Sequence, residues 1–280
     1  MRHYLTSDQV KAFQSHLQNE EKSQNTISKY TRDLRKFFCF CEDNPYISKE
    51  TVLQYKEFLS TGYALSSANS MLAALNSFFQ FIGWHDCVIK TFKSQQAAFR
   101  PQEKELTMEE YRALVHAAQG KNAERMSLLI QTIAATGIRI SELPFITVEA
   151  VHAGRTQVTL KGKSRVVVIP GTLCLKLKNY AERKRITTGS IFVTKSGRPM
   201  DRSNICRTMK RLGKLAGISE EKLFPHNLRH LFAVRYYETE HDLARLADIL
   251  GHSSVNTTRI YTMVSSEEHM QAINQMGMVV

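Results

Sequence analysis

Residues 223–261 read LFPHNLRHLFAVRYYETEHDLARLADILGHSSVNTTRIY, and this stretch determines how the rest of the chain must be arranged. On a helix that begins near His226, the side chains of His226, Arg229 and His230 fall within an arc of about 100°. Apolar side chains take the opposite side, so we expect that side to face the core and the His/Arg side to face elsewhere. The His/Arg side lies near the helix N-terminus, where free N–H groups and a partial positive charge suit a phosphate.

The remainder of the stretch predicts two more helices. Apolar residues recur with helical spacing through residues 243–250, and Gly251 ends this helix, so that His252 falls in a turn. One of the two serines that follow then caps a third helical piece, which ends at Tyr261.

Imidazoles, a guanidinium and a phenol are groups that phosphoryl transfer can use. Cations hold a phosphate, imidazoles move protons and a phenol can attack. Each residue alone has a more ordinary explanation, because a His-x-x-Arg pair is more often a surface pair or a satisfied buried pair. Tyr236 and Tyr237 are alternative phenols. Arg139 and Glu142, in the upstream segment IRISELPFI, first suggest an intrahelical ion pair.

The rest of the chain divides into two predicted domains, as a length of 280 residues suggests. Residues 1–90 contain four helical patterns and predict an all-α domain. Residues 91–105 are polar, include Pro101 and lack periodicity, which indicates a linker. Residues 106–280 predict a second domain of helices with one small sheet. The expected fold class is therefore mainly α with a small antiparallel β-sheet.

The individual elements follow from apolar spacing and caps. Helices are expected at residues 6–18, 26–41, 49–59 and 66–82 in the first domain, and at 106–119, 124–136, 173–185 and 203–216 in the second. The segment 148–170 holds two β-branched or aliphatic runs separated by the basic turn KGKSR, which predicts the antiparallel sheet. A short strand is also expected at residues 191–194, IFVT.

The charge of the chain indicates a polyanionic partner. The formal net charge is +12, and residues 155–235 hold 19 Lys/Arg against 4 Asp/Glu, which is more than a solvated face needs. No amphipathic anchor stands out, so a membrane surface is the weakest choice of partner. The five cysteines are scattered, without disulfide or metal-site spacing, and no apolar signal segment is present. These features favour a reducing cytosol.

Five motifs occur in order along the chain: TGIRISEL, KGKSRVVVIP, HNLRH, LGHSS and TTRIYT. At these motifs the chain resembles the tyrosine recombinase (phage integrase) family, and in length it is nearest to the Xer-type members. The segment NTISKYTRDLRKFF resembles that family's DNA core-binding domain. The resemblance implies a site-specific recombinase that cleaves and rejoins DNA by two transesterifications, through a 3′-phosphotyrosyl intermediate and a Holliday junction. It also implies that no ATP, metal ion or other cofactor is required.

The resemblance assigns a role to each matching residue. Arg139 and Arg229 would hold the scissile phosphate, and Tyr261 would be the nucleophile. His226 matches the histidine that assists proton removal from the nucleophile, and His252 matches the position that hydrogen-bonds the phosphate.

A lysine is expected to protonate the 5′-hydroxyl leaving group. Lys163 matches the family's β-hairpin lysine, but the spacing before it is one residue shorter than in common relatives, so Lys161 is an alternative. Glu142 and His230 match supporting positions that orient the reacting groups. DNA contacts are expected from Lys29, Arg32, Lys36, Lys161, Arg165, Arg202 and Lys210.

The expected partners are double-stranded DNA recombination sites and other recombinase subunits. The family works as a tetramer, formed from one chain or together with a related recombinase or accessory protein. Residues 265–280 predict a short capped helix, which the family often docks into a neighbouring subunit; the alternative is a helix folded back on its own domain. The expected location is the bacterial cytoplasm, in association with the nucleoid.

Two other functions share parts of this pattern. A type IB topoisomerase uses the same cleavage chemistry, but the separate core-binding module and the C-terminal tail argue against it. A DNA-binding protein without catalysis is disfavoured by the intact set of Arg139, Arg229 and Tyr261.

Overall fold

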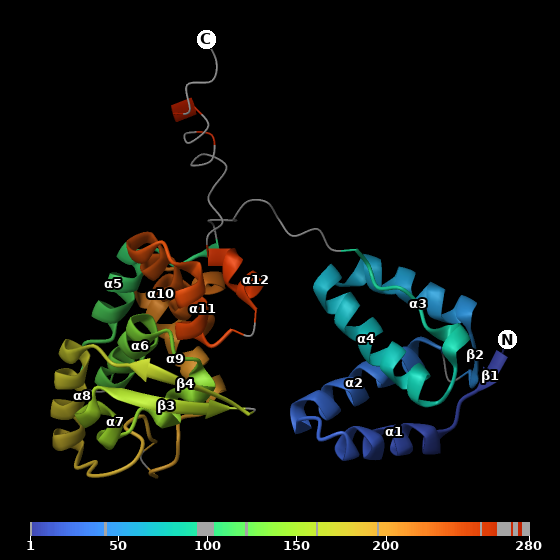
Figure 1. Ribbon diagram of the computed structural model, residues 1–280, viewed down its shortest axis with the longest axis horizontal. Coiled ribbons are helices and arrows are strands. Elements are labelled where there is room, and N and C mark those ends of the chain that lie inside the picture. Colours follow the sequence, from blue (N-terminus) through green and yellow to red (C-terminus); the bar gives the residue numbers. More distant parts are fainter. Residues whose placement is uncertain are drawn as a thin grey trace. The chain divides into compact units, whose positions relative to one another are not determined.

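Two separately packed units make up the chain, Met1–Gln96 and Ala97–Val280 (Figure 1). The computed structural model describes residues 2–41, 44–93, 104–120, 123–160, 162–194, 196–252 and 254–261, together with residues 270, 274 and 275, but not the side chains of Leu160 and Lys163. The division between the units falls inside the polar segment 91–105. The helices and two small antiparallel sheets confirm the predicted fold class.

The N-terminal unit is built on four helices, α1 (Ser7–Asn19), α2 (Gln24–Phe40), α3 (Lys49–Gly62) and α4 (Leu65–Phe81), and a 3-10 turn, η1 (His85–Cys87). Helix α1 begins where the Thr6 side chain accepts the Gln9 backbone N–H and the Gln9 side chain accepts the Thr6 N–H. The predicted positions of all four helices are confirmed to within a few residues, because each has a long apolar stripe. Phenylalanines such as Phe37, Phe78 and Phe79 fill the core.

A small sheet in this unit was not predicted. Strand β1 (Arg2–Tyr4) pairs antiparallel with β2 (Tyr46–Ser48), with His3 opposite Ile47. Each strand has only three residues, too few for an alternating pattern, so the expectation of an all-α unit was wrong at this point.

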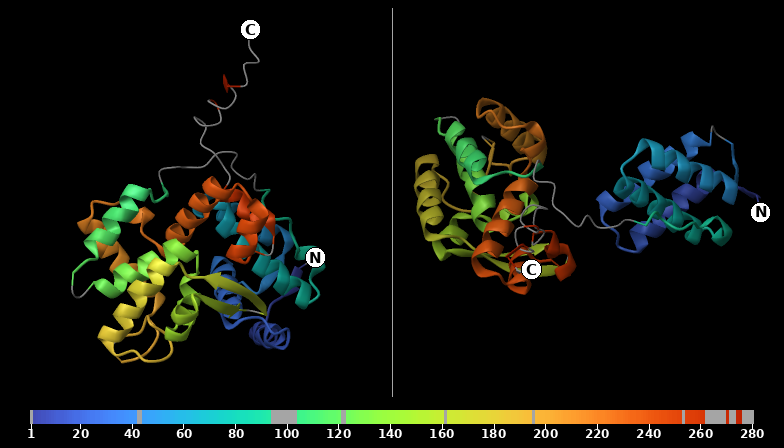
Figure 2. Two further views of the ribbon diagram at one scale, coloured as in Figure 1. Left: turned by 60° about the vertical axis from the view of Figure 1, so that its left-hand side comes forward. Right: turned by 90° about the horizontal axis from the view of Figure 1, so that it is seen from above.

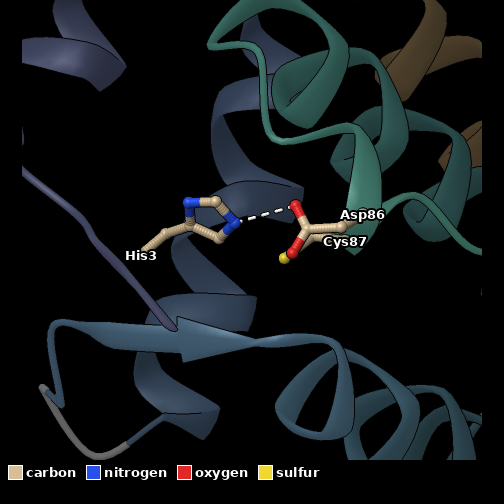
Figure 3. A group of neighbouring side chains, drawn as sticks. All are labelled: His3, Asp86 and Cys87. Carbon is tan, nitrogen blue, oxygen red and sulfur yellow. Dashed lines mark hydrogen bonds and ion pairs between the residues drawn. The ribbon is translucent and has the colours of Figure 1, made fainter. Parts of the chain in front are cut away.

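His3 fastens this sheet to the last turn of the unit. Its Nε2 lies 2.8 Å from Asp86 Oδ1 (Figure 3). Its ring also stacks on that of Trp84, with the ring centroids 4.7 Å apart. Cys87 lies beside the pair, and burial raises the pKa of its thiol to about 11, so that the thiol stays protonated at neutral pH. The group therefore reads as a His–Asp pair that ties the start of the chain to η1.

The C-terminal unit contains most of the secondary structure. Its helices are α5 (Met108–Ala117), α6 (Glu124–Thr136), α7 (Val148–Ala153), α8 (Gly171–Lys184), α9 (Arg202–Leu215), α10 (Pro225–Glu240), α11 (Leu243–Leu250) and α12 (Val255–Thr258). Short 3-10 turns are η3 (Ile140–Phe145), η4 (Glu220–Lys222) and η5 (Arg259–Tyr261), and β3 (Arg155–Leu160) pairs with β4 (Lys163–Val168) as an antiparallel hairpin.

Helix α6 is the centre of this unit. It is buried along most of its length and packs against α5, α8, α9 and α10. The hairpin lies on the flank of these helices, with β4 next to α11 (Figures 1 and 2). This packing brings the ends of α6 and α11, the turn η3 and strand β4 to one place. Among the described residues, no helix has the length and apolarity needed to cross a lipid bilayer.

Two predictions about this unit were wrong. Residues 148–153, assigned to the sheet region, form the short helix α7, because Thr147 caps the Ala150 N–H and Gly154 ends the helix with φ +68°. Residues 191–194 do not form a strand, and the described part of this segment has only an isolated bridge between Val193 and Pro199. No neighbouring strand extends that bridge into a ladder within the described residues.

Candidate active site

Arg229 lies at the centre of the site. It projects from α10 and is only 3% exposed, which differs from the expectation that the whole His/Arg side of this helix faces away from the interior. Its Nη1 donates to the Gly137 carbonyl at 2.6 Å, and its Nη2 donates to the Leu250 carbonyl at 2.6 Å. Helix periodicity could not predict this burial, because both acceptors belong to other helices.

Both acceptors lie at helix C-termini. Gly137 ends α6 and Gly251 ends α11, each in the left-handed region with φ +62°. The last carbonyls of a helix lack helical partners and carry partial negative charge, so they can accept from a buried guanidinium. The fold thus holds Arg229 between two negative helix ends.

Arg139 stands at the start of η3, beside Arg229. Its backbone N–H donates to Glu142 Oε2 at 2.8 Å and its Nη1 donates to Glu142 Oε1 at 2.9 Å. Its Nη2 reaches the Gly251 carbonyl at 3.3 Å. The sequence suggested an ion pair within a helix, but here Glu142 closes a cap around the residue that precedes a 3-10 turn. The Arg139 side chain remains 39% exposed, so an anion from solvent can reach it.

Glu142 is a buried carboxylate that serves two arginines. It is 2% exposed, and a second guanidinium, that of Arg165, donates to its Oε2 at 2.6 Å. Burial opposes ionisation of this carboxyl, but the Arg139 N–H and the charges of Arg165 and Arg139 outweigh it, so the pKa of Glu142 is lowered. Glu142 is therefore an anion at neutral pH.

Arg165 was expected to contact DNA from the hairpin turn. It lies instead within β4, opposite Val158, with its side chain 10% exposed. Its Nη1 donates to the Ile249 carbonyl at 2.6 Å. A signal in the sequence could have indicated this, since residue 165 shares strand parity with Val167, which is buried.

His252 follows α11 and contacts Arg229 directly. Its Nε2 lies 3.1 Å from Arg229 Nη2 and its Nδ1 lies 2.8 Å from Thr258 Oγ1. Because the guanidinium can only donate, Nε2 accepts and the neutral ring carries its hydrogen on Nδ1. Burial and the charges of Arg229, Arg139 and Arg165 lower the pKa of His252 to about 4.

Tyr261 closes the site as the last residue of η5. It is 3% exposed, its ring is nearly parallel to that of His252 with the centroids 6.1 Å apart, and His230 lies against it at 4.9 Å. Burial raises the pKa of the Tyr261 phenol, although Arg229 and Arg139 partly offset this. The phenol is therefore protonated in the absence of a phosphate and needs a base to become a nucleophile.

Helix α10 contains two histidines of the site, His226 and His230, in its N-terminal half. His230 Nε2 is 2.9 Å from Glu105 Oε1, and the Asn227 side chain donates to the Lys104 carbonyl at 2.8 Å, so the chain entering this unit is fastened to α10. His226 is exposed. The protein around it displaces part of its solvent, which together with the charges of Arg229, His230 and Arg139 lowers its pKa.

The site as a whole has a surplus of positive charge. Arg139, Arg165 and Arg229 face one carboxylate, Glu142, among the described residues. Burial and its two guanidinium neighbours lower the pKa of Arg229 to about 10, so it stays charged at neutral pH. A phosphate oxygen would relieve this repulsion, which makes the site suitable for a phosphodiester.

The expected catalytic lysine is not located by the structure. Lys163 is the first residue of β4, paired with Leu160, two positions before Arg165, but its side chain is not described. Lys161 lies outside the described residues. The remaining candidates, Arg139, Glu142, His226, Arg229, His230, His252 and Tyr261, gather around the ends of α6 and α11.

Three of the expected DNA contacts share a groove in the N-terminal unit. Lys29, Arg32 and Lys36 project from α2 and line a groove of about 420 Å³ whose other wall is the start of α4. Lys29 and Arg32 both reach the buried carboxylate of Asp33, at 2.8 and 3.2 Å. In the C-terminal unit Arg202 is exposed at the start of α9, and Lys210 pairs with Glu220 at 3.1 Å.

Comparison with known proteins gives consistent results for both units. Residues 104–268 match the phage integrase family, and residues 10–85 match the phage integrase N-terminal SAM-like domain. The chain is 30% identical to tyrosine recombinase XerA of Pyrococcus furiosus over 98% of its own length and 96% of the relative's. It is 31% identical to tyrosine recombinase XerD of Halalkalibacterium halodurans over 89% and 91%. A lambda integrase tetramer bound to a Holliday junction has a similar fold, with a TM-score of 0.71, 19% identity and coverage of 91% and 76%.

Proposed function

Because the chain belongs to the phage integrase family and is a site-specific tyrosine recombinase that breaks and rejoins DNA, we propose that Tyr261 is its nucleophile and that Arg139 and Arg229 bind the scissile phosphate. The observation that carries this proposal is the burial of Tyr261 against His252, which contacts Arg229, in a pocket where the charges of Arg229 and Arg139 act on the phenol. That pocket supplies positive charge, which stabilises the negative charge that a pentacovalent phosphate gains as it is attacked.

The reaction is a pair of transesterifications. The Tyr261 oxygen attacks phosphorus and forms a 3′-phosphotyrosyl bond, while the bond to the 5′-oxygen breaks and that oxygen takes up a proton. In the second step a 5′-hydroxyl from the partner duplex attacks the same phosphorus and releases Tyr261. One phosphodiester is exchanged for another at each step, so the bond energy is retained. Exchange of one strand pair before the other passes through a Holliday junction, the kind of DNA to which the lambda integrase tetramer is bound.

The histidines are proposed to handle protons and the phosphate. His226, exposed at the start of α10 with a lowered pKa, is neutral at pH 7 and able to accept the phenol proton. His252 hydrogen-bonds a phosphate oxygen once the anion enters. Its Nε2 now accepts from Arg229, so donation requires it to gain a proton, and a nearby phosphate anion favours this by raising its pKa.

A lysine from the hairpin is proposed to protonate the 5′-oxygen. Lys163 is favoured because it matches the lysine of the family motif and is the first residue of β4, the strand that also contains Arg165. Lys161 remains the alternative; it falls between β3 and β4 in the sequence and lies outside the described residues. Either lysine would arrive on the hairpin rather than on the helices that hold the phosphate.

The partners are DNA sites and further subunits. We propose that the groove of Lys29, Arg32 and Lys36 receives the DNA backbone, since Asp33 orients the cations without neutralising all of them. Arg202 and Lys210 are proposed as weaker contacts from the C-terminal unit. The enzyme is proposed to act in the cytoplasm as a tetramer, with residues 265–280 packing on a neighbouring subunit; that segment lies almost wholly outside the described residues.

The test is a covalent trap. Wild-type protein is incubated with radiolabelled recombination-site DNA that is nicked near the cleavage position, and adducts are separated on a denaturing gel. We expect an adduct from the wild type and none from Tyr261→Phe, with the tyrosine identified by peptide mapping. Tyr237→Phe is the control: it removes a phenol from α10, whereas Tyr261 belongs to η5, and this variant should retain the adduct. Absence of any wild-type adduct, or an adduct from Tyr261→Phe, would overturn the proposal.

A further inference from the structure

Arg165 is a cation of this pocket that has no part in the proposed reaction steps. Both of its terminal nitrogens are engaged by the protein, Nη2 with Glu142 Oε2 and Nη1 with the Ile249 carbonyl, each at 2.6 Å. Its Nε is buried and has no hydrogen-bond partner among the described residues. Burial of a third cation beside two others is unfavourable, and burial lowers the pKa of Arg165. Such an arrangement calls for a compensating function.

The first contact leads to Arg139. Glu142 Oε2 accepts from both the Arg165 guanidinium and the Arg139 backbone N–H, while Oε1 accepts from the Arg139 guanidinium. Glu142 cannot rotate toward Arg139 or away from it without breaking its bond to Arg165. The direction of the Arg139 guanidinium is therefore set through this carboxylate by Arg165.

The second contact leads to the end of α11. The carbonyls of Ile249, Leu250 and Gly251 accept in turn from Arg165, Arg229 and Arg139. A Cβ at Gly251 would stand 2.5 Å from Arg165 Cδ, so this helix end and the Arg165 side chain are in close contact. Three successive carbonyls thus fix the spacing of three guanidiniums.

We propose that Arg165 is a positioning residue for catalysis, which holds Glu142 and the end of α11 in the geometry that aims Arg139 at the scissile phosphate. We assign it no phosphate contact, because its Nη2 is paired with the Glu142 carboxylate at 2.6 Å, whereas Arg229 forms no ion pair with a carboxylate among the described residues. Since it belongs to β4, it also connects the hairpin that carries the candidate lysines to the phosphate pocket. This inference rests on the proposed role of Arg139.

The test compares cleavage chemistry with DNA affinity in four variants. Arg165→Met removes both contacts with similar volume, and Arg165→Lys keeps the charge but cannot bridge two acceptors in the same way. Arg139→Ala removes the group that is positioned. Arg155→Met, on the exposed end of β3 in the same hairpin, is the matched control. Single-turnover cleavage of nicked site DNA is measured at saturating protein, with the binding constant measured separately.

We expect Arg165→Met to slow cleavage by about 100-fold, as misplacement of a reacting group does, with DNA affinity changed less than about threefold. Added to Arg139→Ala, the same substitution should slow cleavage by less than about threefold more, because both act through one group. A substrate with an uncharged methylphosphonate at the cleavage position should relieve the defects of Arg139→Ala and Arg165→Met alike. The cleavage rate of Arg165→Lys should lie between those of wild type and Arg165→Met.

Two outcomes would overturn the proposal. One is a full additional 100-fold loss when Arg165→Met is placed on Arg139→Ala, which would mean an independent role. The other is wild-type cleavage by both Arg165 variants. If Arg165→Met fails to fold, as judged by its thermal melt, Arg165→Lys decides the question with the same readouts. A wild-type protein that forms no adduct would instead refute the proposed function, so the two failures are distinguishable.

Discussion

The arginines of this pocket differ in how much of each side chain is accessible to solvent. Arg229 is 3% exposed, whereas the Arg139 side chain is 39% exposed. In the proposed reaction an approaching phosphate should therefore meet Arg139 first, with the more deeply buried Arg229 behind it. Because its contact with the Gly251 carbonyl is long, at 3.3 Å, Arg139 can exchange that bond for one to the phosphate at small cost.

His252 makes stability depend on pH in a defined window. The pKa of this residue is about 4 in the folded protein against an ordinary 6.5, so between these values the unfolded chain binds a proton that the folded chain does not. The free energy of unfolding should therefore fall as the pH drops from about 6.5 toward 4, and His226, whose pKa is also lowered, acts in the same direction.

Urea unfolding at pH 7 and pH 5 measures this effect. We expect the wild type to lose more stability over that interval than His252→Asn does. His241→Asn, at the exposed C-terminal end of α10, should keep the wild-type decline. An equal decline in His252→Asn would contradict the assignment.

The choice between the two lysines can be made with a modified leaving group. A DNA substrate with sulfur in place of the bridging 5′-oxygen releases a thiol, whose low pKa makes proton donation unnecessary. We expect Lys163→Ala to slow cleavage of ordinary DNA by about 100-fold and to cleave the sulfur substrate near the wild-type rate. Arg139→Ala should remain slow on both substrates. If Lys161→Ala shows this rescue and Lys163→Ala does not, the proton donor is Lys161.

At the scale of elements, two helix ends do most of the positioning. The ends of α6 and α11 supply carbonyls to Arg229, and the end of α11 also serves Arg139 and Arg165. Both ends need glycine, because the terminal residue has a positive φ and lies close to other groups. Helix ends are thus both structural stops and part of the anion pocket.

Substitution of two glycines separates the effect of a positive φ from the effect of a close contact. Gly137 and Gly154 both end helices with positive φ, but a Cβ at Gly137 would lie 2.5 Å from Phe232 Cδ1, whereas one at Gly154 meets nothing within 4 Å. Gly154→Ala should cost about 1 kcal/mol, the conformational strain alone. Gly137→Ala should cost about 1–3 kcal/mol more because of the clash. Chemical denaturation measures both, and equal losses would show that the close contact is unimportant.

The sequence predicted elements better than it predicted their contacts. Long apolar stripes located α1 to α6 and α8 to α11, because periodicity is local information. The β1–β2 pair could not be found, since it depends on pairing between residues more than 40 positions apart in three-residue strands. In the site, the described residues that were named from the motifs lie close together. The burial of Arg229 depends on carbonyls of distant helices, which no local pattern contains, whereas the inward position of Arg165 had a local signal in its strand parity with Val167.

For the whole molecule, the structure places the proposed nucleophile in its own subunit's pocket. Tyr261 lies against His252 and His230 of the same chain. Each subunit should therefore cleave with its own tyrosine, because Tyr261 and the described arginines and histidines of the proposed site lie together in one chain.

A mixing experiment examines this arrangement. Tyr261→Phe and Arg229→Ala proteins, the latter enlarged by a tag, are combined on nicked site DNA and adducts are sized on a denaturing gel. We expect no more adduct from the mixture than from either variant alone, while a mixture containing wild type gives adduct of wild-type size only. An adduct of the tagged size in the mixture would show that a tyrosine is donated between subunits.

The burial of Tyr261 also bears on how long a covalent DNA–tyrosine linkage resists hydrolysis. A DNA strand held on tyrosine is a lesion for as long as the linkage lasts, and water is the most abundant molecule able to destroy it. In the proposed adduct, a tyrosine as buried as this one, with two imidazole rings against it, would leave water little access to the phosphorus. The phosphotyrosyl linkage would then persist until the 5′-hydroxyl of a correctly aligned strand attacks it. Opening this cover, for example by His230→Ala, should increase the fraction of adducts that decay to a free 3′-phosphate end, which end-labelled DNA would reveal.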